Sequence, residues 1–233
     1  MGATLTIRLH CWVCDQRFEA EQPRSYALSG RGSDLCPRPV GLNPLPLLVH
    51  ICPNCGFTGD GRGFDPEQAD DQVQEWVLAG GLTALDRDSD RSDVKYERAA
   101  LCHARRRRPS PLQVAEFYLA ASWSAQLEEA PERAPSYQEE AAGHLERALL
   151  IGEVADEERA IMSYLAGELR RRLGEFEAAL QLFDEAAVEF TQHGGPRWLL
   201  QALGQQAGLA KHRSSAEAEL AVGKRSDGNT TRH

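Results

Sequence analysis

Two pairs of cysteines carry the strongest chemical signal in this sequence. Cys11 and Cys14 form one C-x-x-C motif, Cys52 and Cys55 form a second, and 37 residues separate the two pairs. Two thiolates three positions apart can occupy adjacent corners of a tetrahedron when the backbone turns sharply between them, so two such turns complete a four-sulfur zinc site. The spacing therefore predicts one structural zinc ion per chain, held by these four cysteines.

The residues around each pair favour the turns that such a site needs. In "CPNCG", Pro53 restricts the backbone of the turn, and Gly56 permits a positive φ just after the second cysteine. The first motif has Asp15 in the place of this glycine, so its turn is expected to be less regular. The gap between the pairs exceeds the roughly 15 to 20 residues of a compact site. We therefore expect an additional loop or strand between them.

Two other interpretations of these cysteines remain open. A thioredoxin-like redox pair is disfavoured because neither motif begins a helix inside a β-α-β unit. Alternatively, the cysteines are ordinary core residues. The spacing leaves Cys36 and Cys102 without a partner. A buried thiol is the favoured role of Cys36, although it lies between the two motifs and could approach the metal, and Cys102 is expected in a helical core.

Other candidate sites are weaker. The segment 86–97 has acidic residues at calcium-loop positions, but Arg91 replaces the glycine that the loop requires. The segment "GDGRGF" resembles a phosphate-binding loop, yet no Lys-Ser or Lys-Thr follows it. The basic run Arg105–Arg108 is most simply a solvated helix end, and its role is left open. No catalytic constellation stands out, and a closed four-sulfur shell leaves no position for a reactive water.

Short strands are expected to position the cysteines. Residues 4–10 alternate apolar and polar side chains, as in a half-buried strand, and lead into the first motif. Residues 46–52 are a second strand candidate and lead into the other motif. We therefore predict a small zinc-ribbon-like β subdomain over residues 1–60.

The rest of the chain is expected to be helical. Asp65, Pro66 and Gln68 form a capping-box arrangement that predicts a helix beginning at residue 66, and Gly80 and Gly81 would end it. Six further helices follow from apolar periodicity and proline breaks. They are predicted at 92–106, 111–129, 136–152, 157–173, 176–192 and 196–212.

One helix pair has the pattern of a tetratricopeptide repeat. Small and aromatic residues recur with the spacing of that repeat. They are Gly167, Gly174, Phe176, Ala179, Phe183 and Ala186. The pattern predicts an antiparallel, tetratricopeptide-like helical-hairpin domain over residues 61–212, with a disordered tail over 213–233. The alternative is an irregular helical bundle that contains one accidental match.

Charge and hydropathy restrict the classes of partner. The 233-residue chain has a net charge of −9, and residues 111–192 carry −11 of net charge. An acidic protein of this kind repels a phosphate backbone, so nucleic acid is disfavoured as a partner. No apolar run approaches the roughly 20 residues of a membrane span, and the first residues lack the apolar core of a signal peptide. We expect a cytoplasmic, mainly α protein that does not enter membranes.

Several blocks together resemble a bacterial family named domain of unknown function 2225. The blocks are "SDLCP", "NPLPLLVHICPNCGF" and "YLAGELRRRLG". This resemblance implies a zinc-ribbon-like N-terminus joined to tetratricopeptide-like helices, and it implies no established activity.

The leading functional hypothesis is a non-catalytic adaptor that binds a protein or peptide partner on its helical domain, because repeat arrays commonly do so. One alternative is a thiol-based redox enzyme or metal-dependent enzyme that uses the C-x-x-C pairs. A second alternative is a nucleic-acid accessory protein that binds through the zinc ribbon.

Overall fold

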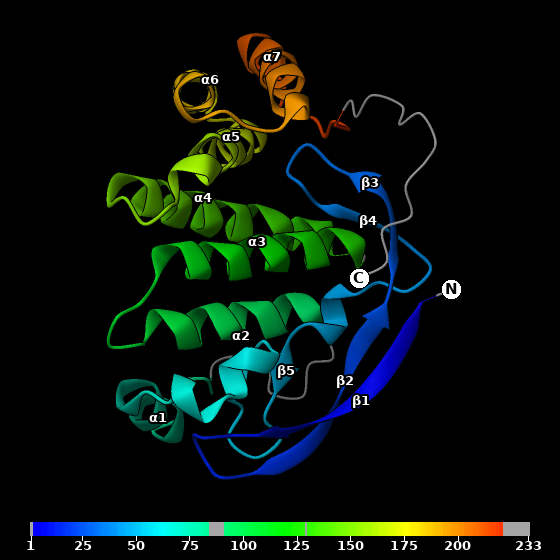
Figure 1. Ribbon diagram of the computed structural model, residues 1–233, viewed down its shortest axis with the longest axis vertical. Coiled ribbons are helices and arrows are strands. Elements are labelled where there is room, and N and C mark those ends of the chain that lie inside the picture. The colour runs from blue at the N-terminus through cyan, green and yellow to red at the C-terminus, as the bar shows by residue number, and fades with distance from the viewer. Residues whose placement is uncertain (1, 84–90, 129, 221–233) are drawn as a thin grey trace.

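A computed structural model of the chain describes residues 2–83, 91–128 and 130–220. Within these ranges the protein is mainly helical, with small antiparallel strand pairs in its N-terminal part (Figure 1). The predicted fold class is therefore confirmed at this level. Most of the acidic part of the calcium-like segment at 86–97 lies outside the described residues, and so do residues 221–233 of the predicted tail.

The strands of the described residues form three separate antiparallel pairs. Strand β1 pairs with β2, β3 with β4, and β5 with β6. Their bounds are Ala3–His10 and Arg17–Ser25 for the first pair, Ala27–Arg31 and Pro37–Val40 for the second, and His50–Ile51 and Thr58–Gly59 for the third.

The predicted strand at 4–10 is present as β1, whereas the one predicted at 46–52 is shorter. Its first half is a 3-10 turn, η1, over Leu45–Leu47. Pro44 and Pro46 bring no amide hydrogen to a strand ladder, so only β5 pairs with a neighbour. Four strands were not predicted. Prolines interrupt the alternation of apolar and polar residues around β2, β3 and β4, and β6 has only two residues.

The first helix begins later than predicted. Asp65 precedes only a 3-10 turn, η3, over Pro66–Gln68, and its side chain makes no capping hydrogen bond. Helix α1 spans Asp71–Leu78, and the Asp70 carboxylate accepts hydrogen bonds from two amides of its first turn. Asp70 is therefore the N-cap, in place of the predicted Asp65. The extended backbone of Ala69 separates the 3-10 turn η3 from helix α1, so the helix cannot begin at residue 66.

Six longer helices follow α1 in the part of the chain that the structure describes, and each predicted boundary lies within about two residues of the observed one. They are α2 (Ser92–Ala104), α3 (Pro111–Leu127), α4 (Ala134–Leu150), α5 (Asp156–Arg172), α6 (Phe176–His193) and α7 (Arg197–Lys211). Consecutive helices pack against each other and are stacked in chain order from α2 to α7 (Figure 1).

Close contact between α5 and α6 depends on one glycine. A Cβ atom placed on Gly167 would lie 2.8 Å from the Phe183 ring and 3.2 Å from the Ala179 carbonyl oxygen. These residues belong to the small-and-aromatic pattern identified in the sequence, and both Ala179 and Phe183 are buried. The contact explains why a small residue stands at this position, while the classification as a tetratricopeptide repeat stays a prediction.

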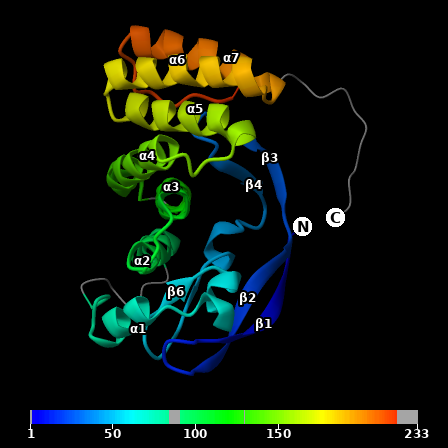
Figure 2. The same ribbon diagram turned by 60° about the vertical axis from the view of Figure 1, so that its left-hand side comes forward.

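The N-terminal strands lie along one side of the helical stack (Figure 2). The loop between β3 and β4 reaches α5, where Ser33 donates a hydrogen bond to Glu168. The chain that follows α7 returns to the same loop, because the Ser33 amide donates to the carbonyl of Ala218 at 3.0 Å. Residues 213–220 therefore contact the body of the protein.

Candidate metal centre

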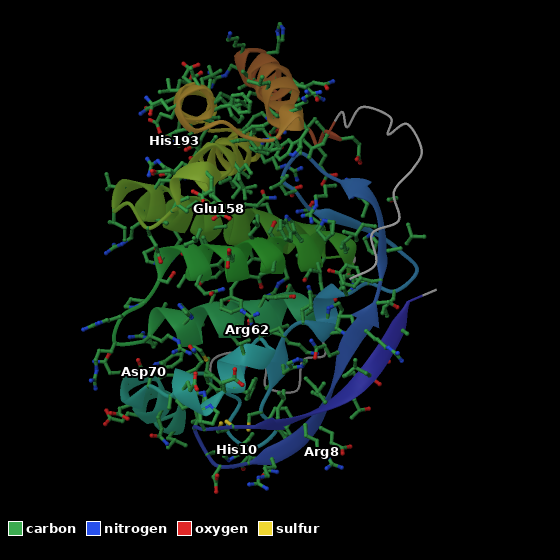
Figure 3. The ribbon with its side chains drawn as sticks, in the orientation of Figure 1. Arg8, His10, Arg62, Asp70, Glu158 and His193 are labelled. Carbon is green, nitrogen blue, oxygen red and sulfur yellow. The ribbon has the colours of Figure 1, made fainter. Side chains whose placement is uncertain are left out.

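The structure brings the four predicted cysteines into one group. Their Sγ atoms all lie within 4.8 Å of one another, although the two pairs are far apart in the sequence. Across the pairs, Sγ of Cys11 lies 3.7 Å from Sγ of Cys55, and Sγ of Cys14 lies 3.5 Å from Sγ of Cys52. The sulfur atoms gather near His10, at the end of β1 (Figure 3).

Both C-x-x-C turns have the same hydrogen-bonding pattern. In the first, the Asp15 amide donates to the Cys11 carbonyl at 2.8 Å, and in the second, the Gly56 amide donates to the Cys52 carbonyl at 2.9 Å. Asp15 has a φ of 62° and Gly56 a φ of 78°. Aspartate is among the few residues that tolerate this left-handed conformation, so the first turn closes without a glycine. The two turns are equivalent in spite of their different sequences.

The sulfur spacing fits a tetrahedral ion. A zinc–sulfur bond of about 2.3 Å in tetrahedral geometry places neighbouring sulfur atoms about 3.8 Å apart. The two distances measured across the pairs are close to this value. Cys11 and Cys52 are fully buried, while Cys14 and Cys55 are partly exposed. The group can therefore hold a metal ion at the edge of a buried cluster, and four thiolates are a donor set suited to zinc.

The mutual effects of the thiols show why a cation would suit this group. A hydrogen bond with Cys11, followed by one with Cys55, lowers the pKa of the Cys52 thiol to about 2. The contact with Cys52 raises the pKa of Cys11 to about 12, and contacts with Cys11 and Cys52 raise the pKa of Cys55. One thiolate thus forms readily and suppresses the next. A bound divalent cation would remove this repulsion and favour four thiolates together.

Side chains from α1 and α2 hold the two turns in place. Gln74 on α1 donates to the carbonyl of Val13 at 2.9 Å, inside the first turn. Arg98 on α2 is 1% exposed, and its Nη2 donates to the carbonyl of Gly56 at 2.8 Å. These contacts fix the backbone beside the cysteines, so the helical part takes part in shaping the site.

Sequence reasoning missed Arg98, although a signal for it exists. Val94, Arg98 and Cys102 are spaced four residues apart, so they share one face of α2. An arginine between two apolar residues on such a face indicates a buried charge with specific acceptors. A search for charged residues inside predicted apolar stripes would have identified it.

A family comparison agrees with this architecture. The model of the family described as "Uncharacterized protein conserved in bacteria (DUF2225)" matches residues 6–205. The chain belongs to this family. Comparison with curated proteins and with solved structures found no match. The matched range includes the four cysteines of the sulfur group and, completely, the six helices α1 to α6 of this DUF2225 chain.

The remaining cysteines of this DUF2225 protein lie outside the sulfur group. Cys36 is buried, and burial followed by the negative charge of Asp34 raises the pKa of its thiol to about 12. Cys102 is buried in the apolar cluster that also includes Cys11 and Cys52. Among the described residues, the group of Cys11, Cys14, Cys52 and Cys55 is the one suited to a metal.

The basic run Arg105–Arg108 has structural contacts. Arg105 stacks on the Trp76 ring, Arg106 donates to the carbonyl of Gln68, and the Arg107 amide donates to Asp70. These contacts join the end of α2 to α1 and the turn before it. None of the helices in the described ranges is long and apolar enough to cross a membrane.

Proposed function

We propose that this DUF2225 chain is a non-catalytic, cytoplasmic adaptor in which one structural zinc ion stabilises the N-terminal part and the helices bind a partner protein. The observation that supports it is a groove between α4, α5 and α6, with a volume of about 1200 Å³. Leu149, Leu150, Leu182 and Val188 contribute apolar surface to it. Leu150 is 86% exposed and Val188 is 55% exposed, which is unusual for large apolar residues that serve only the core.

Charge at the groove indicates the chemistry of the partner. Arg170 pairs with Glu146 and Glu175, and Arg159 pairs with Glu189. Asp184 and Glu185 also line the groove, and neither has a cationic partner within the described residues. The groove therefore has surplus negative charge around an apolar floor. Its complement is a basic amphipathic peptide, with leucine-like side chains on one face and lysine or arginine beside them.

The alternative functions have less support. Four cysteines around one ion leave no open coordination position, so a metal-dependent hydrolase is not favoured. A redox role would need thiols that are free to react, and binding of a metal would occupy all four. A nucleic-acid partner would meet an acidic surface over most of the helical part.

A peptide-display experiment tests the adaptor proposal. Random 16-residue peptides would be selected on the zinc-loaded full chain, and the affinities of enriched peptides would be measured by fluorescence anisotropy. We expect basic amphipathic peptides whose affinity falls at least about tenfold, or about 1.4 kcal/mol, in Leu150→Asp. Leu200→Asp is the matched control, because Leu200 is 54% exposed on α7 and does not line the groove.

Charge reversal provides a second readout. Asp184→Lys should weaken the same peptides and should reduce the salt dependence of their binding. The proposal fails if no peptide is enriched, or if enriched peptides bind Leu150→Asp and Leu200→Asp with equal affinity.

A further inference from the structure

A second cavity lies where the cysteine-bearing part meets the helices. It has a volume of about 200 Å³, and its walls come from the segment after Cys55, from α2 and from α3. We call it the junction cavity. Its polar and charged lining residues are Thr58, Asp60, Arg62, Gln68, His103, Arg106 and Gln113. It is smaller than the roughly 300 to 1,000 Å³ of sites for drug-sized ligands, so a small molecule is the expected occupant.

The wall formed by residues 59–64 is held in a fixed shape. Asp60 Oδ1 accepts a hydrogen bond from the Gly63 amide at 2.7 Å, which closes the 3-10 turn η2 (Gly61–Phe64). Trp12 Nε1, from the first cysteine turn, donates to the Gly63 carbonyl at 2.8 Å. Phe64 is buried against the rings of Phe18 and Phe57. The cavity is thus preformed, and one of its walls is joined to the first cysteine turn.

The charge of the junction cavity differs from that of the whole chain. Arg62 and Arg106 outweigh Asp60, so the lining has a net charge of +1, whereas the chain carries −9. Within the described residues, the Arg106 side chain donates one hydrogen bond, from Nη1 to the Gln68 carbonyl at 3.0 Å, so its other N–H groups are available to a ligand. Arg62, which is labelled in Figure 3, has no ion pair within the described residues.

His103 adds an uncharged polar group to this cavity. Burial, followed by the positive charge of Arg106, lowers the pKa of His103 to about 4, while Asp60 and Glu153 act in the opposite direction. Its ring is therefore neutral at pH 7 and offers one donor and one acceptor nitrogen. Neither nitrogen has a hydrogen-bond partner in the part of the chain that the structure describes. The Phe117 ring lies 6.1 Å from the His103 ring, centroid to centroid.

We propose that the junction cavity binds a small molecule with an oxyanion group, either a carboxylate or a phosphate. Arg62 and Arg106 bind the oxyanion, because guanidinium groups recognise both of these anions with paired N–H donors. His103 and Gln113 contact the polar remainder of the molecule, and Phe117 contacts its apolar part. This site is separate from the groove between α4, α5 and α6, so it does not depend on the adaptor proposal.

Titration calorimetry of the zinc-loaded full chain tests this inference. Inorganic phosphate and succinate are the two probes, and they distinguish a phosphate-bearing from a carboxylate-bearing ligand. We expect saturable binding of at least one probe, weakened about tenfold in Arg62→Gln. Arg108→Gln is the matched control. Arg108 is exposed and lies two residues after Arg106 in the basic run, but it does not line the cavity.

Nuclear magnetic resonance of the histidine side chains provides an independent readout. Binding should shift the imidazole signals of His103, and His103→Asn would assign these signals among the seven histidines. Removal of the metal with a chelator should abolish binding, since Trp12 and Phe57 would no longer hold the loop. The inference is overturned if neither probe saturates below about 10 mM, or if Arg62→Gln and Arg108→Gln bind equally well.

Discussion

Arg98 places a buried positive charge next to one turn of the cysteine group. Its Nη2 donates to the Gly56 carbonyl, and its Nε lies 3.4 Å from the hydroxyl of Thr58. Four thiolates around a divalent ion would carry a net charge of −2, and a nearby guanidinium would offset part of this charge in a region with little water. Arg98 therefore links the second turn of the candidate metal centre to α2.

A cysteine substitution tests the metal centre directly. Cys52→Ser should lose stoichiometric zinc and should unfold at a lower denaturant concentration, because structural zinc contributes roughly 10–16 kcal/mol in isolated zinc-finger peptides. Elemental analysis and urea unfolding are the measurements. In the unmodified chain, a chelator should release one zinc ion and expose four thiols together.

Cys36→Ser is the control for this substitution, because Cys36 is buried but lies outside the sulfur group. It should retain zinc at one ion per chain. Retention of one zinc ion by Cys52→Ser would contradict the four-cysteine assignment.

At the scale of secondary structure, the contact between α5 and α6 has little free space. Gly167 faces Phe183 across this contact, whereas Gly143 on α4 has no neighbouring atom within 4 Å of the place where a Cβ would lie. Both glycines lie inside helices, where alanine is intrinsically preferred by about 0.5–1 kcal/mol. The two positions therefore separate helix propensity from interhelical packing.

Alanine substitutions at these two glycines should have opposite effects on the free energy of unfolding. Gly167→Ala should lower it by about 1–3 kcal/mol, because the new methyl group forces the Phe183 ring or α6 to move. Gly143→Ala should raise it by about 0.5–1 kcal/mol. Urea denaturation followed by circular dichroism measures both. Equal effects at the two positions would show that α5 and α6 are packed more loosely than in this structure.

At the scale of the whole molecule, a network of buried charges joins three distant segments. Glu168 accepts hydrogen bonds from Arg171, Arg172 and the Ser33 hydroxyl. Arg172 pairs with Asp34 at 2.9 Å, and Arg171 Nη1 donates to the Ser214 carbonyl at 2.6 Å. The loop between β3 and β4, helix α5 and the segment after α7 therefore meet at one network with two positive and two negative charges.

Removal of Glu168 should destabilise the whole protein. Glu168→Ala leaves the buried guanidinium groups of Arg171 and Arg172 without their main partner, and breaking a buried pair in this way costs about 3–5 kcal/mol. Urea denaturation gives the loss, and hydrogen exchange should increase in residues 32–36 and 214–219. Glu177→Ala is the control, because Glu177 forms only an exposed ion pair with Arg213. A similar loss in both variants would contradict the clamping role of the network.

The sequence by itself determined those features that depend on neighbours along the chain. The two C-x-x-C motifs identified the sulfur group because each turn is local, and the 3.6-residue periodicity placed α2 to α7 to within about two residues. It placed the start of α1 incorrectly, because both Asp65 and Asp70 are suitable N-cap residues and only Asp70 caps the helix. It did not predict β2, β3 and β4, where prolines interrupt the alternating pattern, or β6, which is too short to show one.

Only the tertiary structure decided which distant side chains meet. Ser33 and Glu168 are 135 positions apart, and Trp12 and Gly63 are 51 positions apart, so no periodicity in the sequence relates them. The buried network and the junction cavity both arise from such contacts. Their physical basis is the burial of charged and polar groups, which requires partners that the folded chain supplies from remote segments.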